Sequence, residues 1–289
     1  MKGPATRHDW LLLVGISLIW GSSFMLIDRS LQAFTPVQVA CLRILITGLL
    51  LVPVFIRHRA ALSRTQTQYI TWQSLFGNFI PAFLFPVAQV HVNSATAGIV
   101  NSLSPAWAFL LGLVFFGFSF HWLQLVGITV AFGGALLLLF HPHSLAPTTH
   151  SALLIVATLC YGLSSNLVQR YLKRTHALAI VSTGFVIFSV PALVIFLGTD
   201  SLSALIATPE MHEALAYVII LSVMGSAVAS AMFYRLVQRT NTLFATSVTY
   251  LMPLVALGWG WLGGEPVGFR DFAGMLCILG GIYLLSRKA

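Results

Sequence analysis

The sequence predicts an all-α integral membrane protein with ten transmembrane helices, arranged as two inverted five-helix repeats. Three observations predict this fold. Hydrophobic residues make up 58% of the 289-residue chain, against 15 lysine and arginine residues and 7 acidic residues, and a water-soluble core could not bury so much apolar surface. Apolar runs long enough to cross a bilayer as helices recur along the whole chain. The pattern of the first half of the chain returns in the second half.

Ten apolar runs of roughly 18 to 25 residues are the expected membrane helices. They cover residues 9–28, 36–56, 69–90, 95–116, 122–140, 151–170, 177–198, 212–236, 242–262 and 271–286. The connections between them are short, so we expect one membrane domain and no soluble domain. The first run lacks the cleavage site of a removable signal peptide, and we expect it to remain as a permanent helix.

Basic residues predict the orientation of these helices. If the N-terminus is cytoplasmic and the helices alternate, only Arg29 and Arg270 fall outside and Arg43 falls within a helix. The basic residues that fall inside are Lys2, Arg7, Arg57, Arg59, Arg64, Arg170, Lys173, Arg174, Arg235, Arg239, Arg287 and Lys288. Both termini are therefore expected in the cytoplasm, with the protein in an inner (plasma) membrane of bacterial type. The net charge of +8 then reflects topology, and we expect no nucleic-acid partner.

An internal repeat relates the two halves of the chain. The segment IWGSSFMLIDRSL (19–31) aligns without a gap with CYGLSSNLVQRYL (160–172), and Pro105 corresponds to Pro253. Residues 1–144 and 145–289 are therefore predicted to be two copies of one five-helix unit. Because five is odd, the second copy enters the membrane from the other side. Inverted repeats of this kind suit alternating access around a site near the membrane midplane.

Glycines recur with one spacing in the last predicted helix of each repeat. They are Gly127, Gly133 and Gly134 in the first and Gly274, Gly280 and Gly281 in the second. Gly127, Ala131 and Gly134 fall on one helix face, as Gly274 and Gly281 do on the other helix, and small residues at this spacing let two backbones approach closely. We expect a structural seam, either between these two helices or in a dimer contact.

Several short motifs occur together along the chain. They are Trp20-Gly21-Ser22-Ser23-Phe24, Arg43, the segment from Asn101 to Pro105, Pro253 followed by Gly263-Gly264-Glu265-Pro266, and the terminal Gly-Gly helix. In combination they resemble the EamA branch of the drug/metabolite transporter superfamily, and the sequence is similar to aromatic amino acid exporters. The resemblance implies ten helices in two inverted repeats, a cavity lined mainly by helices 1, 3, 4, 6, 8 and 9, and export of amino acids and other small metabolites. The first repeat has Gly117-Phe118-Ser119-Phe120 where the second has Glu265, so Glu265 is not expected to act in a mirrored pair.

Polar and aromatic side chains on the helices that the resemblance places around the cavity are the predicted substrate-binding residues. They are Trp20, Ser23, Asn78, Phe85, Asn101, Ser104, Tyr161, Ser165, Asn166 and Tyr250. Neutral amides and hydroxyls can pair with a zwitterionic backbone, and Pro105 frees the carbonyl of Asn101 by removing its amide donor. Aromatic rings can hold an apolar side chain. In the alternative interpretation, the polar side chains only join helices, at about 0.6 kcal/mol each.

Arg43 is the charged residue placed well inside a predicted span, where a charge is costly. Asp28 and Glu265 are predicted on the same outer side, so one hypothesis is a charge pair that closes an outer gate. The other is snorkelling of the guanidinium or a static structural pair. Further gating or structural candidates are Gly21, Gly162, Pro105 and Pro253. The small polar face formed by Ser222, Ser226 and Ser230 indicates close helix packing, or a sliding gate.

We expect no metal, no cofactor and no disulfide. The three cysteines, Cys41, Cys160 and Cys277, lie in different apolar runs, and the histidines lie in loops or near helix ends without companions at ligand spacing. An intramembrane enzyme acting on a lipid is an alternative from another class, but it needs paired carboxylates, a metal triad or a nucleophile with its base. None of these motifs occurs in the sequence.

The sequence therefore predicts a transporter and not an enzyme. It is expected to export amino acids with aromatic or other apolar side chains, and related small metabolites, by alternating access in the lipid bilayer, as a monomer or a homodimer. Efflux of drug-like or other metabolite substrates is the nearer alternative, although cationic drugs would be helped by a buried acid that the sequence lacks. No Asp, Glu or His lies near the centre of a predicted span, which favours a uniport or channel-like mode over proton coupling.

Overall fold

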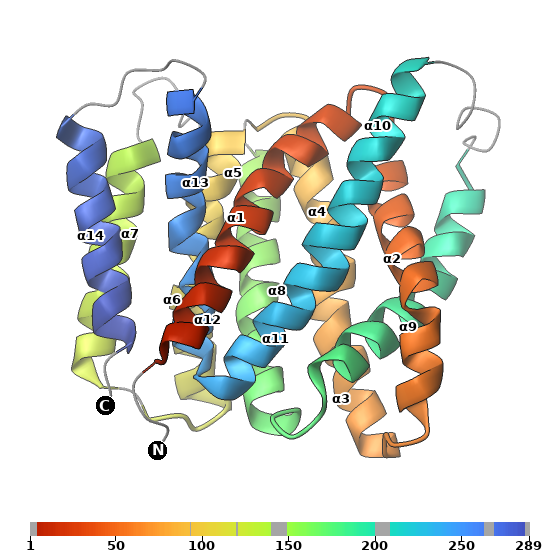
Figure 1. Ribbon diagram of the computed structural model, residues 1–289, viewed down its shortest axis with the longest axis horizontal. Coiled ribbons are helices and arrows are strands. Elements are labelled where there is room, and N and C mark those ends of the chain that lie inside the picture. The colour runs from red at the N-terminus through yellow and green to blue at the C-terminus, as the bar shows by residue number, and fades with distance from the viewer. Residues whose placement is uncertain are drawn as a thin grey trace.

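The computed structural model describes residues 5–92, 94–119, 121–139, 149–199, 209–262 and 269–286. These residues form a bundle of helices, and no strand occurs among them. The helix α1 begins and the helix α14 ends on the same side of the bundle (Figure 1), which we call the terminal face. Glu265 lies outside the described residues.

The helices of the first half of the chain correspond to the first five predicted runs. They are α1 (Arg7–Ser30), α2 (Pro36–Arg59), α3 (Arg64–Ser74), η1 (Leu75–Phe79), α4 (Ile80–Gln89), α5 (Ser94–Asn101), α6 (Ser104–Phe115) and α7 (Trp122–Leu139). Capping boxes begin the first three helices, with Thr6, Thr35 and Ser63 as the N-cap residues. In each box the side chains of the cap and of the third helical residue satisfy backbone amides that would otherwise lack partners.

The helices of the second half correspond to the other five predicted runs. They are α8 (Thr149–Tyr171), α9 (Ala177–Leu197), α10 (Pro209–Ile220), η2 (Leu221–Val228), α11 (Ala229–Arg239), α12 (Thr242–Thr246), α13 (Val248–Leu262) and α14 (Phe269–Ser286). Each of the ten predicted runs is thus mainly helical where it is described, and two of them contain a break. By length and composition, five helical stretches could cross a membrane: Arg7–Ser30, Pro36–Arg59, Ala152–Tyr171, Ala177–Leu197 and Met211–Arg239. Shorter apolar helices accompany them.

Two helical rods contain a π-helical turn. The segment η1 joins α3 to α4, and η2 joins α10 to α11. In η1, the backbone N–H of Ile80 bonds to the carbonyl of Leu75, and Pro81 follows directly. Since a proline ring collides with the carbonyl four residues earlier and cannot donate to it, Pro81 favours this wider turn. The sequence did not predict either π-helical segment, and both lie beside the central cavity described below.

Two other rods are broken near a proline. The break between α5 and α6 falls at Ser102 and Leu103, just before Pro105, and the break between α12 and α13 falls at Ser247, ahead of Pro253. The carbonyl freed by Pro105 is that of Asn101, and it accepts a hydrogen bond from the Ser104 hydroxyl at 2.8 Å. Local side chains therefore satisfy the backbone where the helix is interrupted.

The glycine seam predicted from the repeat is confirmed. Helices α7 and α14 lie side by side at one end of the bundle (Figure 1). A Cβ atom on Gly134 would lie 2.7 Å from the carbonyl oxygen of Gly274, and one on Gly281 would lie 2.6 Å from the Cβ atom of Ala131. A Cβ atom on Gly133 or Gly280 would have no neighbour within 4 Å. The seam therefore uses one glycine of each Gly-Gly pair.

Candidate functional site

A cavity lies among the helices at the centre of the bundle. Its empty volume is about 810 Å³, a figure that includes open space at its mouth. Its wall is built by α1, α2, η1, α4, α5, α6, α8, α11, α12 and α13. These elements include every helix that the resemblance placed at the cavity. They also include α2, which adds Arg43.

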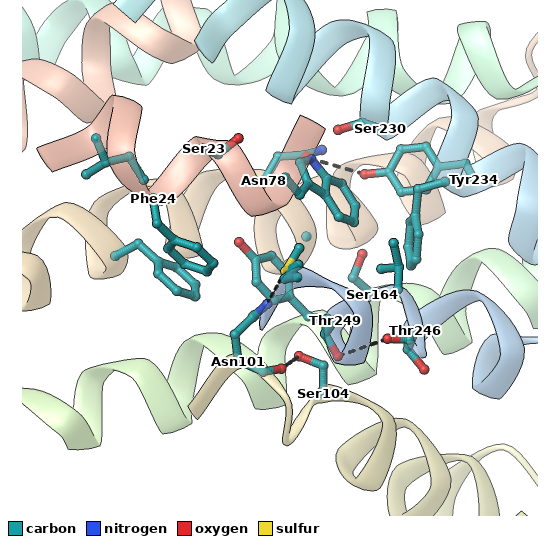
Figure 2. Close-up of a pocket in the computed structure, with 18 of the residues that line it drawn as sticks. Ser23, Phe24, Asn78, Asn101, Ser104, Ser164, Ser230, Tyr234, Thr246 and Thr249 are labelled. Atoms are coloured by element: carbon teal, nitrogen blue, oxygen red, sulfur yellow. Dashed lines mark hydrogen bonds between the residues drawn. The ribbon is translucent and has the colours of Figure 1, made fainter. Parts of the chain in front are cut away.

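Seven of the ten predicted substrate-binding residues line this cavity. They are Trp20, Ser23, Asn78, Phe85, Asn101, Ser104 and Tyr161. Figure 2 shows Asn78 and Asn101 on different sides of the cavity, contributed by η1 and α5. Their role in binding stays a prediction, but the structure does bring these residues together from six different elements.

The structure does not bring the other three predicted residues to the cavity. Ser165 is fully buried, and its hydroxyl donates to the carbonyl of Tyr161 at 2.9 Å. Asn166 turns toward α6, where its amide donates to the carbonyl of Ala108 at 2.9 Å. The hydroxyl of Tyr250 points toward α7 and lies 3.5 Å from the carbonyl of Ile128. Each residue is on a cavity helix but on the face that packs against a neighbour.

A hydrogen-bond chain joins four helical segments at one wall of the cavity. The Gln73 amide donates to the Ser164 hydroxyl at 2.9 Å and to the Tyr234 hydroxyl at 2.6 Å. Tyr234 in turn donates to the Asn78 side-chain oxygen at 3.2 Å (Figure 2). Gln73 and Asn78 belong to the first half of the chain, whereas Ser164 and Tyr234 belong to the second. The chain of bonds therefore connects the two halves of the protein at the wall of the cavity.

Two side-chain amides at the cavity are incompletely satisfied. The Asn78 nitrogen Nδ2 and the Asn101 oxygen Oδ1 are buried and have no hydrogen-bond partner among the described residues. The other atom of each amide is engaged, since Asn78 Oδ1 accepts from Tyr234 and Asn101 Nδ2 donates to the Met252 sulfur at 3.1 Å. A buried polar atom without a partner is costly, so each of these atoms is a place where a ligand or water can bind.

Arg43 does not form the gate pair with Asp28 that the sequence suggested. Its Nε donates to the Ser226 hydroxyl at 2.7 Å, and the guanidinium lines the cavity. Asp28 is exposed at the far end of α1, and Glu265 lies outside the described residues. Thr47 reinforces the contact between α2 and η2, because its hydroxyl lies 3.1 Å from the carbonyl of Ser222. The serine face of η2 therefore holds Arg43 in place.

At the terminal face, contacts join the two halves of the chain. The Arg239 Nε lies 2.6 Å from the Asp9 Oδ1, and Asp9 is 3% exposed. Beside this ion pair, the ring of Trp10 meets Phe244 edge to face, with the centroids 5.2 Å apart. Asp9 begins the first predicted run, on the predicted cytoplasmic side that also holds Arg239, but the pairing of the two residues was not predicted. Opposite charges on one side were the signal that could have found this contact.

Several cavity residues were missed in the sequence analysis. Phe233 and Tyr234 of α11, Thr246 of α12 and Thr249 of α13 all line the cavity. The internal repeat is the feature of the sequence that could have identified them. The separation that relates Pro105 to Pro253 also relates Phe85 to Phe233 and Asn101 to Thr249, and all four of these partners line the wall.

The remaining candidates pack helices closely or adjoin the helix breaks. A Cβ atom on Gly21 would lie 2.9 Å from the Val255 Cβ, and one on Gly162 would lie 2.8 Å from the backbone nitrogen of Ala108. These glycines let α1 approach α13 and α8 approach α6. Pro105 is buried just after the break between α5 and α6, whereas Pro253 is buried inside α13. None of these four residues lines the cavity.

Comparison with known proteins supplies the family. Residues 10–140 and 149–287 each match the model of the EamA-like transporter family. An uncharacterized transporter of Archaeoglobus fulgidus is 24% identical over 288 residues, with 96% of this chain and 99% of that protein covered. A probable terminal-alkyne amino-acid exporter of Streptantibioticus cattleyicolor is 26% identical over 208 residues, covering 69% of this chain and 66% of that protein.

Two further similarities agree with this assignment. A probable amino-acid metabolite efflux pump of Salmonella typhimurium is 23% identical over 288 residues, with 96% of this chain and 95% of that protein covered. A protein of known crystal structure shares the fold, with a TM-score of 0.76 at 14% identity, covering 97% of this chain and 96% of that chain. The family and the names of the relatives indicate a multi-pass membrane transporter and not an enzyme. Because both halves of the chain match the same family model, the protein belongs to the EamA-like transporter family.

Proposed function

We propose that this transporter exports amino acids with aromatic or other apolar side chains, together with related small metabolites. The observation that carries the proposal is the composition of the cavity wall. Aromatic rings such as Trp20, Phe85 and Tyr161 share it with Asn78 and Asn101, whose amides each keep one atom without a partner. Rings can enclose an apolar side chain while fixed polar atoms meet the polar end of the substrate. The amino-acid exporters among the relatives support the same substrate class.

The mechanism we propose is alternating access between two inverted five-helix repeats, residues 1–144 and 145–289. All ten helical rods would then cross the membrane. The two separate matches to one family model support the repeat, as do the π-helical turns in the third rod of each half and the breaks in the fourth. Broken helices at the midplane are typical substrate sites in transporters built from inverted repeats.

The orientation we propose places both termini in the cytoplasm of an inner (plasma) membrane. The support is the excess of arginine and lysine on the side of the terminal face. In this orientation the ion pair of Asp9 and Arg239 closes the cytoplasmic entrance. Loading of substrate for export then requires this pair and the adjacent contact of Trp10 with Phe244 to separate. The two halves would rock about the cavity, as in other inverted-repeat carriers.

Counterflow in proteoliposomes tests the proposed function. Vesicles preloaded with unlabelled phenylalanine should accumulate labelled phenylalanine from outside. Trp20→Ala should lower the rate about tenfold or more, equivalent to roughly 1.4 kcal/mol, because Trp20 lines the cavity and its Nε1 donates to the carbonyl of Gly225 at 2.8 Å. Trp122→Ala is the matched control, because Trp122 is 66% exposed on α7, and it should transport at the wild-type rate.

The contrary result is no accumulation of any amino acid by folded wild-type protein. In that case the proposed substrates would be drug-like compounds or other metabolites. The same vesicles test energy coupling, since no Asp, Glu or His lines the cavity among the described residues. We expect an imposed proton gradient to leave the flux unchanged, as for a uniporter, and a clear acceleration would refute that mode.

A further inference from the structure

Arg43 is the one charged side chain among the described residues that line the cavity. Its Nε donates to the Ser226 hydroxyl at 2.7 Å. The ion pair that occurs among the described residues joins Arg239 to Asp9 at the terminal face, and no described carboxylate lies within 4 Å of Arg43. The guanidinium of this cavity-lining residue therefore has no partner of opposite charge in the described part of the chain.

Physical chemistry favours an anion beside such a group. A charge removed from water is strongly disfavoured unless an opposite charge or several hydrogen bonds compensate for it. A guanidinium carries five N–H donors in a planar fork that matches the two oxygens of a carboxylate, and the contact with Ser226 uses the Nε donor. The outer fork of the guanidinium is the part best suited to a ligand carboxylate.

The two incompletely satisfied amides extend this pattern. Asn78 offers the free donor Nδ2 and Asn101 the free acceptor Oδ1, and both residues line the same cavity as Arg43. A donor beside a cation suits an anionic group, whereas a free carbonyl oxygen suits a group that carries N–H. Together these atoms match a ligand that has an acidic end and a hydrogen-bond donor.

We propose that Arg43 binds the carboxylate of the substrate and makes this group a requirement for recognition, while Asn101 Oδ1 accepts a hydrogen bond from the substrate's amino group. This inference rests on the proposed function and deepens it. It replaces the gate role considered for Arg43 and excludes lipophilic amines without a carboxylate as good substrates. Ser226 acts as a positioning residue, because it holds the guanidinium from the Nε side.

The experiment is a binding measurement that does not depend on transport. Purified full-length protein in lipid nanodiscs is titrated calorimetrically with three ligands that share one ring and a similar chain: phenylalanine, 3-phenylpropionate and phenethylamine. Wild-type protein should bind the two carboxylates at least about tenfold more tightly than phenethylamine, the size of effect expected for a charge-assisted contact. Tighter binding of phenethylamine than of 3-phenylpropionate by wild-type protein would overturn the inference without any variant.

Variants at Arg43 assign the preference to its guanidinium. Arg43→Gln should lose about tenfold or more in affinity for both carboxylates and keep its affinity for phenethylamine. Arg43→Lys retains the charge but not the planar fork of guanidinium donors. It should still bind carboxylates more tightly than phenethylamine, but with lower affinity, and it replaces the glutamine variant if that variant does not fold. Arg235→Gln is the matched control, since it makes the same substitution at an exposed arginine that does not line the cavity, and it should keep the preference.

The two ways of failing can be told apart. If wild-type protein binds phenylalanine but Arg43→Gln keeps the same ranking of the three ligands, the assignment of Arg43 is refuted and the proposed function stands. If folded wild-type protein binds none of the three ligands, the proposed function fails and the assignment fails with it. If Arg43→Gln loses affinity only for the two carboxylate ligands, the result supports both the proposed function and the assignment of Arg43.

Discussion

The glycine seam and the cavity wall bring helices together in opposite ways. At the seam, Gly134 and Gly281 let the backbones of α7 and α14 meet, leaving no room for a Cβ atom. At the cavity wall, side chains such as Gln73, Tyr234 and Arg43 span the space between helices through hydrogen bonds. A backbone that packs against another backbone has no other group to contact in its place. A hydrogen bond between side chains, in contrast, can be exchanged for a hydrogen bond to substrate or water. The seam is therefore suited to hold helices together, and the wall to rearrange.

Filling the seam should have the largest effect. Gly281→Leu places a side chain where even a Cβ atom would lie 2.6 Å from Ala131, and overpacking of this kind costs about 1–3 kcal/mol or more. We expect a marked fall in the yield of monodisperse protein and in the thermal unfolding temperature, measured by size-exclusion chromatography and scanning fluorimetry.

The neighbouring glycine provides the control for the seam. Gly280→Leu adds the same side chain to the same helix one residue earlier, where a Cβ atom would have no neighbour within 4 Å. Its stability should match that of the wild type, with a small gain from helix propensity. Equal destabilisation by both variants would show that bulk anywhere on α14 is harmful and that the seam has no special role.

Breaking the closed terminal face should have an intermediate effect. Arg239→Gln leaves the buried carboxylate of Asp9 without its ionic partner, and loss of such a contact costs about 1–3 kcal/mol. The closed conformation should lose stability relative to one open at this face. In a variant without its native cysteines, a thiol introduced by Thr246→Cys at the cavity should therefore react faster with a polar reagent added on that side.

Arg235→Gln is the comparison for this ion pair. Arg235 is exposed on the same helix, so its substitution removes an equal charge without disturbing Asp9, and the labelling rate should stay at the reference value. If both arginine variants label at equal rates, the pair of Asp9 and Arg239 does not hold the face closed.

Removing one hydroxyl from the cavity wall should have the smallest effect. Tyr234→Phe deletes the link between Gln73 and Asn78, which is worth about 0.5–1.5 kcal/mol. We expect a small loss of thermal stability and a counterflow rate that changes more than the stability does, because the freed amide of Asn78 lines the cavity. Tyr171→Phe, on a ring that is 43% exposed, should leave both quantities unchanged. If Tyr234→Phe lost as much thermal stability as Gly281→Leu, the cavity wall would be as rigid as the glycine seam.

The sequence predicted more of the fold than of the site. Every predicted run is mainly helical where it is described, and the glycine seam lies between the two helices that carry it. At the cavity, Trp20, Asn78 and Asn101 were predicted, but Tyr234 was not. Hydropathy and the family motifs identify the helix on which a site residue lies. The direction in which its side chain points depends on how that helix is rotated against its neighbours.

By itself, the sequence determined the features that depend on local composition and spacing: apolar helices, the carbonyl freed by Pro105, and glycine faces that repeat along a helix. Only the tertiary structure decided which side chains meet across the bundle. In the folded protein, Ser165, Asn166 and Tyr250 form contacts within or between helices and do not line the cavity. Arg43 bonds to Ser226. Asp9 pairs with Arg239. The physical reason is that helical periodicity fixes the relative directions of side chains within one helix. The rotation of each helix, including the offset that a π-helical turn adds, is set by packing between residues far apart in the chain.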